Sequence, residues 1–262
     1  MHPAPPPVAG PLGQLPLPPA RGAALRPPPP PHPTLPLAAA WGAVALTALP
    51  LLLAPIVIAL VQAASMPAVA FVPVVVVASY GPAMAWWWYA SGRYGTGRRL
   101  DDVGLIFRLR DLGWGPLTWL TCLVVQVTVG AIVMWAGVPF TSNTEGLEDR
   151  SSEAGFIVTM IVLAVVVAPI TEEIVFRGLV MRGLLRRFSA PTAIAMQGAI
   201  FGVAHVDPSR GTGNIGLVLI LTSVGIVLGG AAYACRRITA SIVAHAILNA
   251  AALLAVFLDV AP

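Results

Sequence analysis

The sequence predicts an all-α protein, a polytopic bundle of about seven transmembrane helices behind a disordered, proline-rich N-terminal tail. Of its 262 residues, 57% are hydrophobic and only 10% are charged, whereas soluble domains carry about 25% charged residues. With so few charges most of the outer surface must face lipid, where only helices and closed barrels satisfy their backbone hydrogen bonds. Long apolar blocks, separated by arginine-rich or acidic connections, favour helices over a barrel.

The tail comprises residues 1–36, and residues 37–262 form the predicted transmembrane domain. Of the 26 prolines in the chain, 15 lie in the tail. Because proline has no backbone N–H, such a segment cannot form helix or sheet ladders. It is typical of a disordered, polyproline-like chain.

Seven apolar blocks follow the tail. Most of them reach the roughly 20 residues that cross about 30 Å of hydrocarbon, and the fifth is the shortest. They run from Trp41 to Gln62, Ala68 to Tyr89, Leu117 to Val138, Phe156 to Leu185, Ala190 to Val206, Ile215 to Cys235 and Ile238 to Leu258.

The connections alternate in charge. All 15 basic residues are arginine, and arginine-rich connections fall on every second side of the blocks, whereas residues 139–154 are mainly acidic. The positive-inside rule therefore places the N-terminus in the cytoplasm and the C-terminus outside. No basic stripe with interleaved aromatic residues indicates a nucleic-acid partner. Arginine in place of lysine, with abundant alanine and proline, is typical of a GC-rich bacterial genome and predicts an integral protein of the bacterial cytoplasmic membrane.

Polar and charged side chains interrupt the fourth, fifth and seventh blocks, although each charge within a membrane helix costs about 2.5–3.5 kcal/mol. Glu173 and Arg177 lie four residues apart in the order that favours an ion pair. Glu172 is turned by about 100° from Glu173 and has no partner on its own helix. We expect these residues to form one polar cluster with His205, His245 and Asn249, bounded by the fourth, fifth and seventh helices.

Three sequence strings carry a resemblance to a known family. TEEIVFRG (171–178), FGVAH (201–205) and HAILNA (245–250) resemble the motifs EExxxR, FxxxH and HxxxN/D, in the same order. These are the motifs of the CaaX-processing and bacteriocin-processing (CPBP) membrane proteases, which include the eukaryotic enzyme that removes the last three residues of prenylated proteins. The resemblance covers about residues 156–258.

The resemblance implies a role for each matching residue. Glu172 would be the catalytic carboxylate and would activate a water molecule together with His205, while His245 and Asn249 would hold the developing oxyanion. The supporting residues would be Glu173, Arg177 and Phe201. The favoured mechanism needs no cofactor. The family has also been described as metal-dependent, and in that case Glu172, His205 and His245 would bind a divalent ion such as zinc, although the HExxH signature is absent.

The predicted function is therefore an intramembrane endopeptidase that uses a glutamate-activated water, in CaaX-type processing or in peptide maturation. Its partners would be the lipid bilayer and a protein or peptide substrate, lipidated in the CaaX case; no motif sets an oligomeric state. One alternative is a non-catalytic membrane scaffold or immunity protein, which would keep its phenotype in Glu172→Ala. The other is a proton-coupled transporter with Glu172 and the histidines as a relay, which would transport without cleaving.

Overall fold

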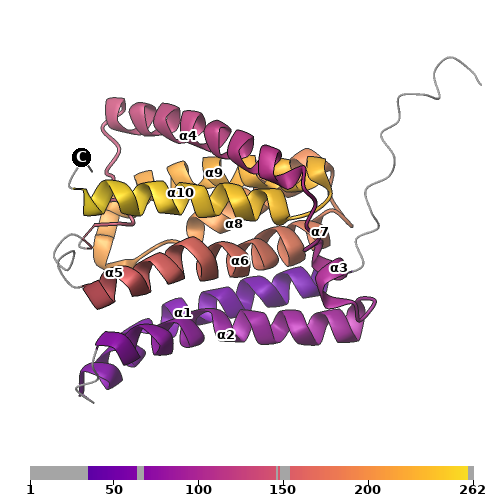
Figure 1. The fold of residues 1–262 in the computed structure, drawn as a ribbon, viewed down its shortest axis with the longest axis horizontal. Helices are drawn as coiled ribbons and strands as arrows, with labels where there is room; N and C mark the ends of the chain where they lie inside the picture. Colours follow the sequence, from indigo (N-terminus) through magenta and orange to yellow (C-terminus); the bar gives the residue numbers. More distant parts are fainter. Residues whose placement is uncertain (1–34, 64–67, 146, 148–153, 259–262) are drawn as a thin grey trace, which may run out of the picture. The chain divides into compact units, whose positions relative to one another are not determined.

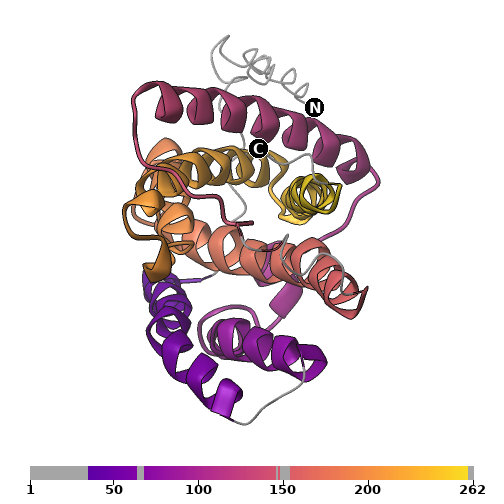
Figure 2. The same cartoon turned by 90° about the vertical axis from the view of Figure 1, so that its left-hand side faces the viewer.

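The computed structural model describes residues 35–63, 68–145, 147 and 154–258. These residues form helices and no strand, which confirms the all-α fold class. The predicted tail lies, apart from its last two residues, outside the described residues. Helices α1 and α2 lie side by side, and α4 packs across α9 and α10 (Figure 1 and Figure 2). The helices are α1 (Leu37–Ala63), α2 (Ala68–Tyr94), α3 (Arg99–Val103), α4 (Asp111–Trp135), α5 (Ala154–Ile161), α6 (Ala168–Glu173), α7 (Arg182–Leu184), α8 (Ala190–Val203), α9 (Asn214–Cys235) and α10 (Thr239–Phe257), with the further helical turns η3 (Val162–Val167), η4 (Ile174–Met181) and η5 (Pro208–Gly213).

Each of the seven apolar blocks contains a long helical stretch. Among the described residues, four helices are long and apolar enough to cross a bilayer, and the described apolar parts of α1 and α8 are shorter. These four are Asp111–Trp135, Ile157–Leu184, Pro208–Cys235 and Thr239–Phe257. The prediction of about seven spanning helices is compatible with this result. Several bounds differ from the prediction: α1 starts at Leu37 and α2 continues to Tyr94, whereas α4 runs from Asp111 to Trp135 and not from Leu117 to Val138. Helix α8 stops at Val203, so it spans only about 21 Å at about 1.5 Å per residue.

The fourth block forms one continuous run of helix from α5 to α7 that twice leaves α-helical hydrogen bonding. Both η3 and η4 are π-helical, and α6 lies between them. Pro169 stands at the start of α6, and proline cannot donate the hydrogen bond that a regular α-helix requires at that position. The wider π turn before it absorbs this irregularity. Single π-helical turns of this kind are frequent at functional sites.

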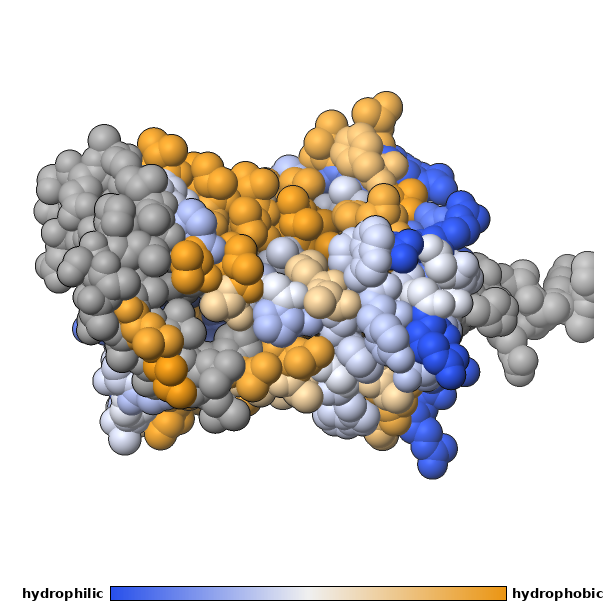
Figure 3. Space-filling view, turned by 90° about the horizontal axis from the view of Figure 1, so that it is seen from below, coloured by the Kyte–Doolittle hydropathy of each residue, from blue (hydrophilic) through white to orange (hydrophobic). Residues whose placement is uncertain are grey.

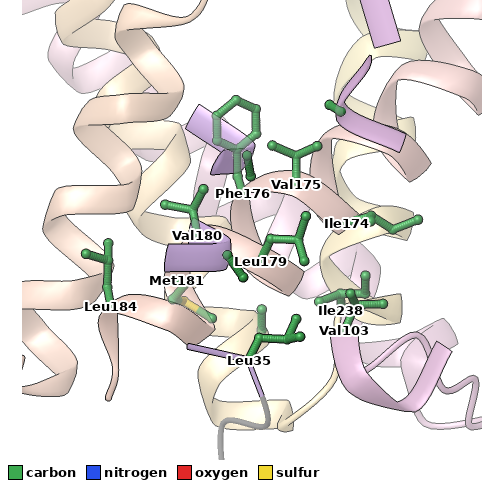
Figure 4. Packing of buried hydrophobic residues seen from close by; sticks show 14 of the residues in the cluster. Leu35, Val103, Ile174, Val175, Phe176, Leu179, Val180, Met181, Leu184 and Ile238 are labelled. Carbon is green, nitrogen blue, oxygen red and sulfur yellow. The ribbon is translucent and has the colours of Figure 1, made fainter. Parts of the chain in front are cut away.

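The η4 turn lies at the centre of the packing. All eight of its residues are buried, as expected for a helix that is surrounded by protein on every side. Its side chains pack with Leu35, Val103 and Ile238, which come from three distant parts of the chain (Figure 4). This core fixes the helical run that carries the two adjacent glutamates.

Small residues bring α8 and α9 into close contact. Gly198 and Gly202 lie on α8, and Gly225 and Gly229 lie on α9. A Cβ atom added to Gly198 would lie 2.6 Å from Cγ1 of Ile226, and one added to Gly225 would lie 3.0 Å from Cα of Gly198. Pairs of small residues four apart allow membrane helices to pack this closely. The contact brings the backbone of α9 within reach of side chains on η4.

The arginine-rich connections meet at one end of the transmembrane domain. The backbone N–H of Ile238, after α9, donates to the carbonyl oxygen of Gly104 at 2.9 Å. Arg237 forms an ion pair with Asp111 at 2.5 Å, and this bond raises the pKa of Arg237. Hydrophilic residues gather at this end of the surface, beyond a largely apolar middle (Figure 3). The arrangement agrees with the predicted alternation of charge, and the orientation of the termini remains a prediction.

Candidate active site

Glu172 belongs to the central polar cluster, and its two carboxylate oxygens have different surroundings. Its Oε1 accepts a hydrogen bond from the hydroxyl of Tyr80 on α2 at 2.7 Å. Its Oε2 lies 3.7 Å from Nε2 of His205 and 3.8 Å from Nε2 of His245. Oε2 is buried and has no hydrogen-bond partner in the described part of the chain. The two imidazoles and one carboxylate oxygen therefore converge without touching, at separations that one water molecule can bridge.

The partner of Nδ1 in each imidazole determines which ring nitrogen carries the proton and therefore whether Nε2 donates or accepts. Nδ1 of His205 lies 2.8 Å from the carbonyl oxygen of Phe201, and Nδ1 of His245 lies 3.1 Å from Oε1 of Glu173. Both partners are acceptors, so each Nδ1 carries a proton and donates. In the neutral ring Nε2 is then a lone-pair acceptor that faces Glu172. The arrangement thus offers three acceptors to a water molecule or to another proton-bearing group.

Glu173 and Arg177 form the predicted pair, and both side chains are fully buried. Nη1 of Arg177 donates to Oε1 of Glu173 at 2.7 Å, and Nη2 donates to the carbonyl oxygen of Gly225 at 3.1 Å. The same carbonyl accepts from Nε2 of Gln197 at 2.7 Å. The Gly225 carbonyl is thus shared by a guanidinium and an amide, which links η4, α8 and α9 behind the site.

The ring of Phe201 packs against both imidazoles and against the guanidinium of Arg177. Its ring centroid lies 4.6 Å from that of His205 and 5.8 Å from that of His245. The guanidinium carbon of Arg177 lies 4.6 Å from the same centroid. Phe201 is therefore a buried aromatic side chain that both imidazoles contact, and its supporting role stays a prediction.

His205 does not lie within α8, although we expected the fifth helix to continue to Val206. The helix ends at Val203, and the chain turns at Ala204. His205 still bonds the Phe201 carbonyl, so the i to i+4 relation survives without a further helical turn. A helix end leaves its last carbonyls without intrahelical partners, and here the imidazole satisfies one of them. The end of α8 thus allows His205 to approach Glu172.

Asn249 lies one turn after His245 on α10, as expected. Its side-chain N–H donates to the carbonyl oxygen of Ala164 in η3 at 2.7 Å. That carbonyl belongs to a π-helical turn. A side-chain amide has two N–H donors, so this bond uses one of the two. The amide is therefore anchored to η3, in the same helical run that carries Glu172.

The cluster includes two polar residues that the motifs do not contain, Tyr80 and Gln197. Tyr80 lies 92 residues before Glu172, in a predicted block that is otherwise mainly apolar. The available signal was a hydroxyl within an apolar helix, and Gln197 similarly interrupts the fifth block. The cluster is therefore bounded by α6, the end of α8 and α10, as predicted, and also by α2.

A metal site receives no direct support from the side-chain arrangement. In the described parts of the chain, no group of three or more His, Cys, Asp or Glu side chains is spaced to hold a metal ion. The donor set of Glu172, His205 and His245 has the composition of a hydrolytic zinc site. Its separations of 3.7 and 3.8 Å, measured from Oε2 to each Nε2, fit a bridging water.

Comparison with known proteins gives one match. The family described as Type II CAAX prenyl endopeptidase Rce1-like matches residues 154–251. This match confirms the resemblance of that region, and it includes all seven residues that the motifs predicted. Tyr80 lies outside it. No curated protein and no solved structure matches the chain.

Proposed function

We propose, from the premise that residues 154–251 match the Rce1-like type II CAAX prenyl endopeptidases, that this chain is an intramembrane endopeptidase in which Glu172 activates water. The observation that carries the proposal is the convergence of Glu172 Oε2 with Nε2 of His205 and Nε2 of His245. A water bound among them would donate its protons to the carboxylate and to an imidazole. Its oxygen lone pair would then be free to attack a carbonyl carbon.

The two oxygens of Glu172 have different tasks in this mechanism. Tyr80 holds Oε1, so Oε2 is the atom that accepts the proton from the attacking water. The C–O bond then forms, and the carbonyl oxygen becomes an oxyanion. Glu172 next delivers its proton to the leaving amine as the C–N bond breaks, which restores the carboxylate. A positioned base contributes about 10²–10⁴ in rate.

The oxyanion requires hydrogen-bond donors. The Nε2 atoms of the neutral imidazoles are acceptors and cannot supply them. The second N–H of Asn249 is one such donor, because Ala164 uses only the first. His245 becomes another when its Nε2 is protonated, because Glu173 at Nδ1 is then the counter-ion. Each donor of this kind contributes about 10²–10³ in rate.

The substrate is a membrane-associated protein or peptide that is cut near the bilayer, in CaaX-type processing or in peptide maturation. Because the arginine-rich end is the cytoplasmic end by the positive-inside rule, the N-terminus lies in the cytoplasm. The arginine-rich, lysine-free composition favours the bacterial cytoplasmic membrane as its location.

The test compares membranes that contain the active protein with membranes that contain Glu172→Gln. Terminal proteomics should reveal a cleaved protein and its new termini in the first sample alone, and the purified wild type should cut a peptide that spans this bond. Turnover by purified Glu172→Gln at the wild-type rate would overturn the proposal. Uptake of a solute into vesicles without any cleavage would instead support the transporter alternative. A chelator added to the wild-type reaction tests the metal-dependent form, since only that form loses activity.

A further inference from the structure

A second candidate site lies in a groove between α4 and α9, at the arginine-rich end. The groove has a volume of about 480 Å³, within the range of about 300–1,000 Å³ that small-molecule sites occupy. Arg110 and Arg237 lie at its mouth. Trp114, Leu117 and Thr121 line it from α4, and α9 contributes Val227, Gly230 and Ala231.

The groove lies on the opposite face of α9 from the supporting pair. Gly225, whose carbonyl accepts from Arg177, and Gly229 face α8. At about 100° per residue, Val227 is turned by about 160° from both glycines, and Ala231 by about 160° from Gly229 and about 120° from Gly225. The buried side chains of Cys122 and Leu228 also pack between α4 and α9. The groove is therefore separate from Glu172 and opens outward from the transmembrane domain.

The charge at the mouth is unbalanced. Arg237 is neutralised by Asp111, which is fully buried. Arg110 is exposed, and its guanidinium forms no hydrogen bond or ion pair with another described residue. Trp114 beside it is half-exposed, and tryptophan is enriched at the level of the lipid headgroups. The mouth therefore fits a phosphate at the membrane interface.

The depth of the groove fits a hydrocarbon chain. From Arg110 to Thr121 the helix rises by about 16 Å, which is about half of a hydrocarbon core of about 30 Å. Gly230 and Ala231 have small or no side chains, so α9 leaves open space on this side of the groove. A Cβ atom added to Gly230 would meet no atom within 4 Å. A charged end at the interface and an apolar channel toward the bilayer centre are the two parts of a phospholipid.

We propose that the groove between α4 and α9 binds an anionic phospholipid, with its phosphate at Arg110 and one acyl chain along Leu117, Thr121 and Gly230. The proposal does not depend on peptidase activity. The full chain, purified in detergent, is titrated with phosphatidylglycerol and with phosphatidylcholine of the same acyl chains, and bound lipid is counted by native mass spectrometry. Phosphatidylglycerol should bind more tightly.

Two variants, each with a matched control, test the two ends of the groove. Arg110→Gln should weaken phosphatidylglycerol binding about fivefold, which corresponds to the roughly 1 kcal/mol that one arginine contributes near an anionic surface. Arg108→Gln, an equally exposed arginine outside the groove, should leave it unchanged. Gly230→Leu should fill the channel and abolish binding of the lipid, whereas Gly92→Leu, also at an open helical position, should not.

Four outcomes would overturn the proposal. Equal losses in Arg110→Gln and Arg108→Gln would show attraction to general surface charge. Equal affinity for the two lipids would remove the role of the arginine. Undiminished binding by Gly230→Leu would place the lipid elsewhere. Inorganic phosphate that displaced the lipid at equal concentration would show a phosphate site without a role for the chain.

Discussion

The adjacent glutamates should respond differently to the same substitution: both variants should lose activity, but only Glu173→Gln should lose much stability. Glu173→Gln removes the only charge that faces the fully buried Arg177 within 4.0 Å among the described residues. Breaking a buried pair from one side leaves an uncompensated charge, at a cost of about 3–5 kcal/mol. At about 2–4 °C per kcal/mol for a protein of this size, the unfolding temperature should fall by about 6–20 °C. Activity should fall as well, because His245 loses its carboxylate partner.

Glu172→Gln should cost much less stability, because its side chain makes fewer contacts that the substitution removes. The amide oxygen can still accept from Tyr80, and Oε2 has no hydrogen bond to lose. The free energy of unfolding should therefore change by less than about 1 kcal/mol, the net contribution of one hydrogen bond. Turnover should fall by about 10²–10⁴, the contribution of a positioned base.

The assay measures thermal unfolding and peptide hydrolysis of each purified variant in the same detergent. The double variant Glu173→Gln/Arg177→Met removes both charges and should recover part of the lost unfolding temperature, because no unpaired charge remains. Equal unfolding temperatures for Glu172→Gln and Glu173→Gln would refute the division between a catalytic and a supporting carboxylate. A double variant less stable than Glu173→Gln would refute the unpaired charge as the cause.

Three further variants test single contacts. Tyr80→Phe should lower kcat/KM about 10–100-fold, because a hydrogen bond to a charged group contributes about 1.5–3 kcal/mol; Tyr89→Phe on the same helix should change nothing, and equal effects in an activity assay would contradict the assigned contact. Asn249→Ala should lower kcat about 10²-fold or more with a smaller change in KM, and a change in KM alone would exclude the oxyanion role. Gly198→Leu should destabilise the α8–α9 contact by about 1–3 kcal/mol or more, measured as a lower unfolding temperature, whereas a loss no larger than that of Gly92→Leu would show that the close packing is dispensable.

The helical fold and most of the cluster could be predicted because both depend on local patterns. The length of the apolar blocks predicted the helices. The free-energy cost of a charge in lipid identified Glu172, Glu173 and Arg177 as candidate functional residues. Spacing along one helix predicted the ion pair, which the structure shows at 2.7 Å. These features require only the residues within a few turns of helix.

Features that depend on contacts between distant segments could not be predicted in this way. Tyr80 meets Glu172 only because α2 packs beside the central run, and no local pattern contains that contact. The end of α8 could not be predicted because Phe201 and His205 keep a helical spacing of four residues although the helix stops at Val203. The π-helical turns around α6 depend on how Pro169 and the neighbouring helices share hydrogen bonds, whereas hydropathy records none of this.

The hydroxyl of Tyr80 comes from outside the segment that matches the family. A chimera that received only residues 154–251 of this chain would gain Glu172 but not Tyr80. The hydroxyl that holds Oε1 of Glu172 would then have to come from the second helix of the recipient. Such exchanges should retain activity only when the recipient offers a hydroxyl at the equivalent height. Transplantation of α2 together with the matched region would carry both Glu172 and the hydroxyl that holds its Oε1.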